Sequence, residues 1–232
     1  MSGVNDQAGT SHAVRNAGRG DKWRLSCSAG VVSVVVMASV ACSRTYLADY
    51  KFHGQGHRQG PGSTVDLDVD SSVSGIGLSD EHLQWAWTIN DYRISVEVTN
   101  QSSSLIRLLW GESGFSVDSG DSQPLYVTQG RITARGDPVG LVEVAPHQHA
   151  EFDMYPRNYM GDWAGWTVPR RAVFDPPGFL VGHTPEEIIG IAQPAVGKTI
   201  RIKLPVVLAD SRFEYDFAFT VAEVRARPKR LL

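Results

Sequence analysis

Two histidines at alternate positions are the residues of this chain best placed to bind a metal. His147 and His149 are followed at the same spacing by Glu151 and Asp153, and alternate residues of a β-strand lie on one face. Imidazole and carboxylate groups bind zinc, and zinc with an open coordination position activates water for hydrolysis. The pattern is compatible with a metal-dependent hydrolase at His147 and His149. Because the spacing fixes no third ligand, we favour solvent-exposed polar residues and expect no cofactor.

A second group of residues has the composition of a hydrolase site. Residues 120–122 read Gly-Asp-Ser, which resembles the nucleophile motif of trypsin-like proteases, and His82 and Asp91 precede them. Gln123 and Pro124 stand where that family has the glycines of its oxyanion loop, and triads are defined by geometry. The segment therefore predicts a polar turn. We assign no catalytic residue and expect a protein that is not an enzyme.

Asp66, Asp68 and Asp70 also alternate along the chain. Carboxylates of this kind bind calcium, but calcium loops require a turn and a glycine. The alternation with Val65, Leu67 and Val69 instead predicts a strand with an acidic edge that discourages pairing between sheets.

Aromatic and basic residues collect between positions 155 and 183, among glycines and prolines. A long irregular segment of this type often carries binding function, and tryptophan, tyrosine and arginine bind glycans or protein surfaces. The candidate ligand-binding residues are Arg157, Tyr159, Trp163, Trp166, Arg170 and Arg171. The alternative is that the aromatic side chains fold inward and close one end of the domain.

These candidates are spread over a chain with strong period-two patterning. Apolar residues alternate with polar or small ones over 83–89 and 94–98, and shorter runs near 105–110, 115–117, 125–127, 139–144 and 152–154 also indicate strands. The strongest pattern is C-terminal, where the runs 200–206 and 213–221 flank a turn at 209–211. It predicts a long antiparallel hairpin with an aromatic face.

One short helix interrupts the strands. Thr184 is a capping residue, Pro185 occupies the first helical position and Glu187 the third, which together form a capping box. Pro194 ends the helix. With many short strands and this one connector helix, the sequence predicts an all-β fold, an immunoglobulin-like antiparallel β-sandwich.

Overall composition limits the function. The 232 residues are 42% hydrophobic and carry a formal net charge of −3, which suits one globular domain and gives no reason to expect nucleic acid as a partner.

The N-terminal region has the order of an export signal. Arg15, Arg19, Lys22 and Arg24 precede an uncharged run that ends at Ala41. Counted from Leu25, the run has about 17 residues, the lower limit for a spanning helix and sufficient for the apolar part of a signal peptide. An uncleaved N-terminal anchor is the alternative.

The end of that run, Ala38-Ser39-Val40-Ala41-Cys42, resembles the lipobox of bacterial lipoproteins. The resemblance implies cleavage before Cys42, attachment of diacylglycerol to its sulfur and of a fatty acid such as palmitate, and, with Ser43 following, sorting to the periplasmic face of the outer membrane. Cys27, the other cysteine, lies inside the presumed signal.

The resulting expectation has four parts. Residues 1–41 are a signal peptide with an N-terminal extension, 42–64 the lipidated cysteine and a flexible tether, 65–224 the β-sandwich and 225–232 a basic tail. We expect a non-enzymatic, lipid-anchored protein that binds or scaffolds a component of the cell envelope, either an envelope protein or a glycan. The alternative is a glycan- or peptidoglycan-binding module that uses residues 155–183.

Overall fold

In the residues that it describes, the computed structural model is an antiparallel β structure with one short α-helix. It describes residues 46–70, 75–90, 93–129, 138–163, 166–169, 181–182 and 184–228, and for 162–169 and 181–182 only the backbone. The predicted signal peptide and Cys42 lie outside the described residues. No helix in the described part is long and apolar enough to span a membrane. The prediction of an all-β fold is confirmed.

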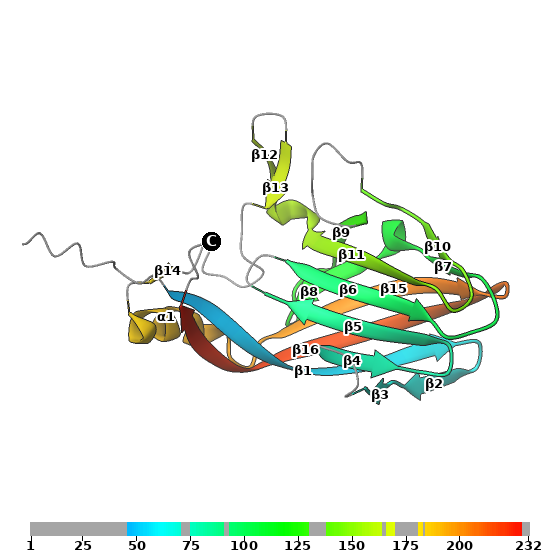
Figure 1. The fold of residues 1–232 in the computed structure, drawn as a ribbon, viewed down its shortest axis with the longest axis horizontal. Coiled ribbons are helices and arrows are strands. Elements are labelled where there is room, and N and C mark those ends of the chain that lie inside the picture. The colour runs from blue at the N-terminus through cyan, green and yellow to red at the C-terminus, as the bar shows by residue number, and fades with distance from the viewer. Residues whose placement is uncertain are drawn as a thin grey trace, which may run out of the picture. The chain divides into compact units, whose positions relative to one another are not determined.

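Within the described residues, fourteen strands belong to one sheet and two form a separate hairpin (Figure 1). The elements are β1 (Tyr46–Gly60), β2 (Ser63–Asp66), β3 (Asp68–Val69), β4 (Ile76–Ser79), β5 (Leu83–Ile89), β6 (Ile94–Asn100), β7 (Ile106–Leu108), β8 (Gly114–Val117), β9 (Gln123–Gln129), β10 (Val142–Val144), β11 (His149–Pro156), β12 (Met160–Trp163), β13 (Trp166–Pro169), β14 (Val181–Gly182), α1 (Pro185–Ala192), β15 (Thr199–Leu208) and β16 (Ser211–Pro228). Short 3-10 turns lie at Trp110–Glu112, Arg157–Tyr159 and Gln193–Ala195.

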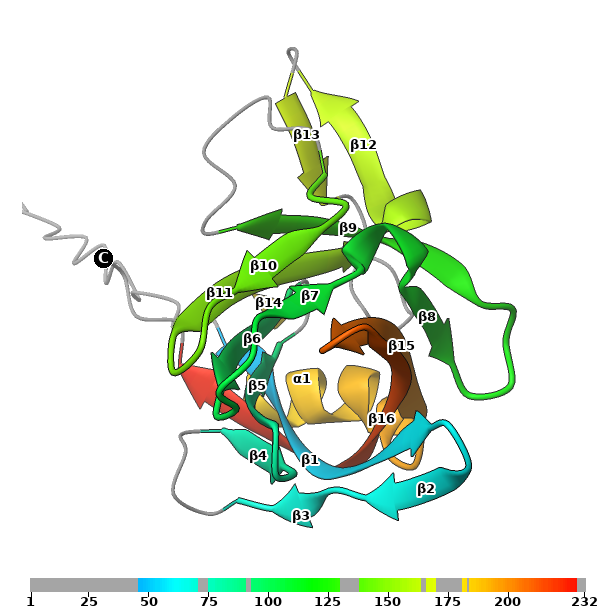
Figure 2. The same cartoon turned by 90° about the vertical axis from the view of Figure 1, so that its right-hand side faces the viewer.

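The large sheet follows the order β14-β1-β16-β15-β8-β9-β11-β6-β5-β4-β3, so that β5 faces β16 across the core (Figure 2). Trp85 and Trp87 of β5 meet Phe217 of β16 at ring-centroid distances of 4.9 and 4.8 Å. Residues 63–69 connect β1 to β4, because β2 pairs with β1 and β3 pairs with β4. Aromatic packing between these strands forms the centre of the core.

The C-terminal hairpin is confirmed in detail. β15 and β16 pair from Thr199↔Thr220 to Leu208↔Ser211, and both residues of the connecting turn, Ala209 and Asp210, have positive φ. Such two-residue turns match the twist of paired strands. The inward face of β15 is fully buried, as its apolar alternation predicts.

The predicted flexible tether is wrong for residues 46–64. Residues 46–60 form β1, which pairs with β16 from Tyr46↔Pro228 to Gln59↔Glu214. The inward positions include Gly54 and Gly56 in place of large apolar residues, and a Cβ at either would press on Ile76 or Leu67. Phe217 and Phe219 of β16 lie beside these glycines and supply the apolar surface that β1 lacks.

The C-terminal boundary also needs correction. Arg225 and Arg227, assigned to a basic tail, belong to β16 and pair with β1. The domain therefore extends from Tyr46 to Pro228, and residues 229–232 lie outside the described residues.

The connector helix forms as its capping signals predict. Thr184 adopts an extended backbone, and its hydroxyl oxygen accepts a hydrogen bond from the Glu187 N–H at 3.1 Å. The α-helix ends at Ala192, two residues before Pro194. Ile188 and Ala192 are buried, and α1 packs against β1, β14 and β16.

Candidate functional site

An open cleft of about 570 Å³ lies between β1, the start of β4 and the end of β5. Its volume is within the roughly 300–1,000 Å³ of small-molecule sites. The lining residues are Asp49, Tyr50, Lys51, Phe52, His53, Gly75, Ile76, Trp87, Thr88, Ile89, Ala222 and Glu223. The cleft thus combines aromatic and aliphatic residues with residues of both charges.

A β-bulge shapes one wall of the cleft. Lys51 pairs with Glu223 while the next residue of β1, Phe52, pairs with Val221, so Ala222 is an extra residue in β16. A bulge bends its strand and redirects neighbouring side chains, and bulges are frequent beside binding sites. In this wall the Tyr50 and Phe52 rings lie 6.3 Å apart.

A glycine shapes the opposite wall. Gly75 has a φ of +96°, and a Cβ on it would collide with the backbone oxygen of Trp87. Only glycine allows the chain to lie this close to β5 in the left-handed region. The close approach of Gly75 and Ile76 to Trp87 and Thr88 forms the wall that faces β1.

Lys51 and Glu223 of the cleft form an ion pair. The Lys51 ammonium lies 3.5 Å from a Glu223 carboxylate oxygen, and Arg225 donates two hydrogen bonds to the same carboxylate, at 2.7 and 3.0 Å. These hydrogen bonds from Arg225 lower the pKa of Glu223. Glu223 is therefore a carboxylate at neutral pH. The aromatic and charged residues of the cleft suit a site that binds a ligand through van der Waals contacts and electrostatic interactions.

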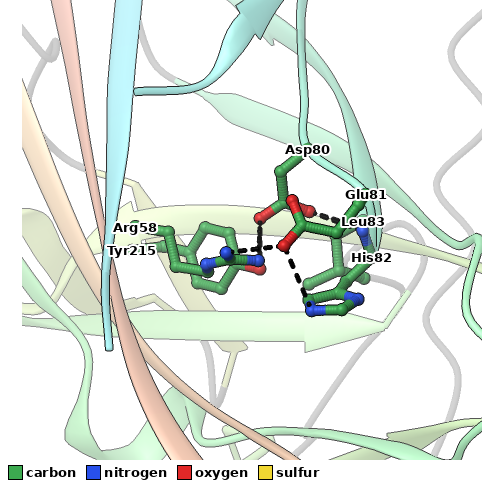
Figure 3. Close-up of polar contacts among 6 residues, drawn as sticks. All are labelled: Arg58, Asp80, Glu81, His82, Leu83 and Tyr215. Carbon is green, nitrogen blue, oxygen red and sulfur yellow. Dashed lines mark hydrogen bonds and ion pairs between the residues drawn. The ribbon is translucent and has the colours of Figure 1, made fainter. Parts of the chain in front are cut away.

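A buried polar network at the β4–β5 turn is the other concentration of charge (Figure 3). Arg58 of β1 is 6% exposed and donates hydrogen bonds to Asp80 at 3.0 Å and to Glu81 at 2.7 Å. The Tyr215 hydroxyl of β16 donates to the same Asp80 oxygen at 2.8 Å. The other Asp80 oxygen accepts from the backbone N–H groups of His82 and Leu83, both at 2.8 Å.

The network joins three parts of the sheet rather than forming an open site. The Asp80 side chain is 1% exposed and that of Arg58 7%, and the Arg58 guanidinium lies 5.2 Å from the Phe213 ring centroid. Burial, and then Asp80, raise the pKa of the Tyr215 hydroxyl, which stays protonated as a donor. The hydrogen bond from Arg58 lowers the pKa of Glu81. We assign this network a structural role.

Asp153 is a further buried carboxylate, at 7% exposure. Ser95 donates to it at 2.6 Å and Arg93 lies 3.4 Å away. Burial, with Asp153 nearby, raises the pKa of Tyr155 to about 12. The hydrogen bond between Ser95 and Asp153 links β6 to β11, where these two residues are directly paired in register.

The proposed zinc ligands are not brought together on one strand face. His147 lies in a turn before β11 with a φ of +58°, whereas His149 begins the strand, and both side chains are exposed. Glu151 is exposed and Asp153 bonds to Ser95. Among the described residues no group of three or more His, Cys, Asp or Glu side chains is placed to hold a metal.

The aromatic segment is divided between the interior and the surface. Tyr155 is buried, Arg157 is exposed and Tyr159 is half-buried, with its ring 6.5 Å from Phe115. Trp163 and Trp166 are directly paired in the β12–β13 hairpin. Arg170 and Arg171 lie outside the described residues, as does Asp91 of the protease-like trio.

Sequence reasoning missed the cleft because its walls come from four separate segments. The alternating Tyr50 and Phe52 were the available signal that residues 46–60 form a strand.

Comparison with protein-family models, curated proteins and solved structures finds no match to this chain.

Proposed function

We propose that this protein is a lipid-anchored, non-enzymatic binding protein of the bacterial cell envelope, and that the cleft beside β1 holds its ligand. The observation that supports binding is the open cleft of about 570 Å³ with aromatic and charged walls. The lipobox-like sequence at Cys42 supports the anchor and the outer-membrane location. An immunoglobulin-like sandwich is also part of the proposal, supported by the packing of β5 against β16.

Filling the cleft is expected to remove the ligand without unfolding the domain. Thr88 lines the cleft and is exposed, so Thr88→Trp places an indole in the ligand's space. Steric overpacking costs about 1–3 kcal/mol, which corresponds to a loss of affinity of about fivefold to 150-fold. Native mass spectrometry of protein extracted from its own membranes measures the ligand that is retained.

Thr64→Trp is the matched control, because Thr64 is an exposed strand residue of β2 outside the cleft. Wild type and Thr64→Trp should carry the same bound species and Thr88→Trp should lack it. Equal occupancy in all three proteins would rule out the cleft as the binding site.

The glycan-binding alternative has one observation in its favour. The register of β12 and β13 places Trp163 opposite Trp166, and paired aromatic residues are suited to contact a sugar ring. Under this alternative, Trp163→Ala abolishes sedimentation with peptidoglycan and Thr88→Trp does not. If Trp163→Ala sediments like wild type, the hairpin does not bind peptidoglycan.

A further inference from the structure

The acidic and basic side chains around the cleft balance one another. Lys51 lies 3.5 Å from Glu223, and Arg225, beside the cleft, donates two hydrogen bonds to the same carboxylate. Asp49 is paired in register with Arg225, and Glu223 first, then Asp49, raise the pKa of the Arg225 guanidinium. Basic and acidic groups thus alternate along this wall. A ligand with a net charge would meet a like charge beside each opposite one.

The other residues of the cleft are apolar or can be neutral. Thr88 and His53 line it and are exposed, and a hydroxyl or an imidazole can donate or accept a hydrogen bond. An uncharged oxygen atom of a ligand therefore finds partners here. Six of the twelve lining residues are aliphatic or aromatic, namely Tyr50, Phe52, Ile76, Trp87, Ile89 and Ala222.

If the cleft holds the ligand, as the proposed function states, we propose that this ligand is an uncharged amphiphile, an apolar chain or ring with a hydroxyl, ester or ketone group. The apolar part lies against half-buried residues such as Phe52 and Ile76, and its removal from water favours binding. The oxygen group bonds to Thr88 or His53. A carboxylate or an ammonium group would lose hydration and meet no unbalanced charge that compensates the loss.

The test protein is residues 42–232 with Cys42→Ala, the chain that the proposed cleavage leaves, without its lipid. All buried core residues of the described chain lie between Ala48 and Val224, so this protein keeps the whole core and lacks the apolar residues before position 42. The probes are octanol, octanoate and octylammonium, which share one chain and differ in the charge of the head group. NMR titration at about pH 8, where histidine is neutral, follows the backbone amides of Gly75 and Thr88 in the cleft.

We expect octanol to shift these amides and to bind about tenfold more tightly than either charged probe. In Thr88→Trp the affinity for octanol should fall. Charged probes that bind as tightly as octanol would overturn the inference and leave the cleft as the binding site, as would amides that do not respond to octanol. Unchanged octanol affinity in Thr88→Trp would instead remove the cleft from the proposed function.

Glu223→Gln tests the balance of charge, because it removes the carboxylate that Lys51 and Arg225 share. Octanoate should then bind about threefold to fivefold more tightly, the size of an exposed charge interaction. Glu214→Gln is the matched control on the same strand. Its carboxylate lies 3.3 Å from Lys203, outside the cleft, and its side chain is 43% exposed, against 46% for Glu223. Equal effects of the two variants on octanoate binding would show that the balanced charges do not select the ligand.

Discussion

Replacing Arg58 with methionine is expected to lower the free energy of unfolding by about 3–5 kcal/mol. Methionine keeps much of the length and apolar surface of arginine but removes the charge that compensates Asp80. The Asp80 side chain, 1% exposed, would then be a buried carboxylate whose remaining donors are Tyr215 and two backbone N–H groups. Urea denaturation monitored by tryptophan fluorescence measures the loss, because Trp85 and Trp87 are fully buried.

Two further variants separate burial of charge from loss of an ion pair. Arg212→Met breaks an exposed pair with Glu112 and should cost less than about 1 kcal/mol. Combining Arg58→Met with Asp80→Asn should cost less than the sum of the single changes, because the uncompensated charge is gone. A cost for Arg58→Met no greater than for Arg212→Met would show that the network does not stabilise the fold.

The elements that could be predicted are those whose signals are local. Alternation over 200–206 and 213–221 and the capping box at Thr184 depend on residues a few positions apart, and both formed as expected. β1 was missed because Gly54 and Gly56 occupy its inward face, and the apolar surface beside them belongs to Phe217 and Phe219, far along the chain. A pattern within one segment cannot reveal such a contribution.

The functional predictions show the same limit. The pairing of Arg58 with Asp80 joins residues 22 positions apart and that of Tyr215 with Asp80 joins residues 135 apart. His147 and His149 alternate in sequence as strand residues do, but the positive φ of His147 places it in a turn. The cleft required the folded arrangement of β1, β4, β5 and β16.

Substituting Cys42 is expected to change the location of the protein completely. In the lipoprotein reading the Cys42 sulfur carries the diacylglycerol, so Cys42→Ala removes the attachment site and, with it, cleavage before residue 42. Stable attachment to a membrane requires more than one acyl chain. Without the Cys42 thiol, the variant carries no acyl chain at this position. Fractionation should find wild type in the outer membrane, and the variant absent from it and larger, since it retains residues 1–41.

Cys42→Ser controls for the size of the side chain and should behave like Cys42→Ala, because a hydroxyl does not replace the thiol in this reaction. If both variants fractionate with the outer membrane at the wild-type size, the anchor does not depend on Cys42. If wild type and variants remain together in the inner membrane, the uncleaved N-terminal anchor is the correct alternative.

The intact mass of wild-type protein extracted from its membranes tests the central claim most directly. The proposed function predicts the mass of residues 42–232 plus a diacylglycerol and a fatty acid on Cys42. A chain that retains residues 1–41, or one cleaved elsewhere and free of lipid, would contradict it.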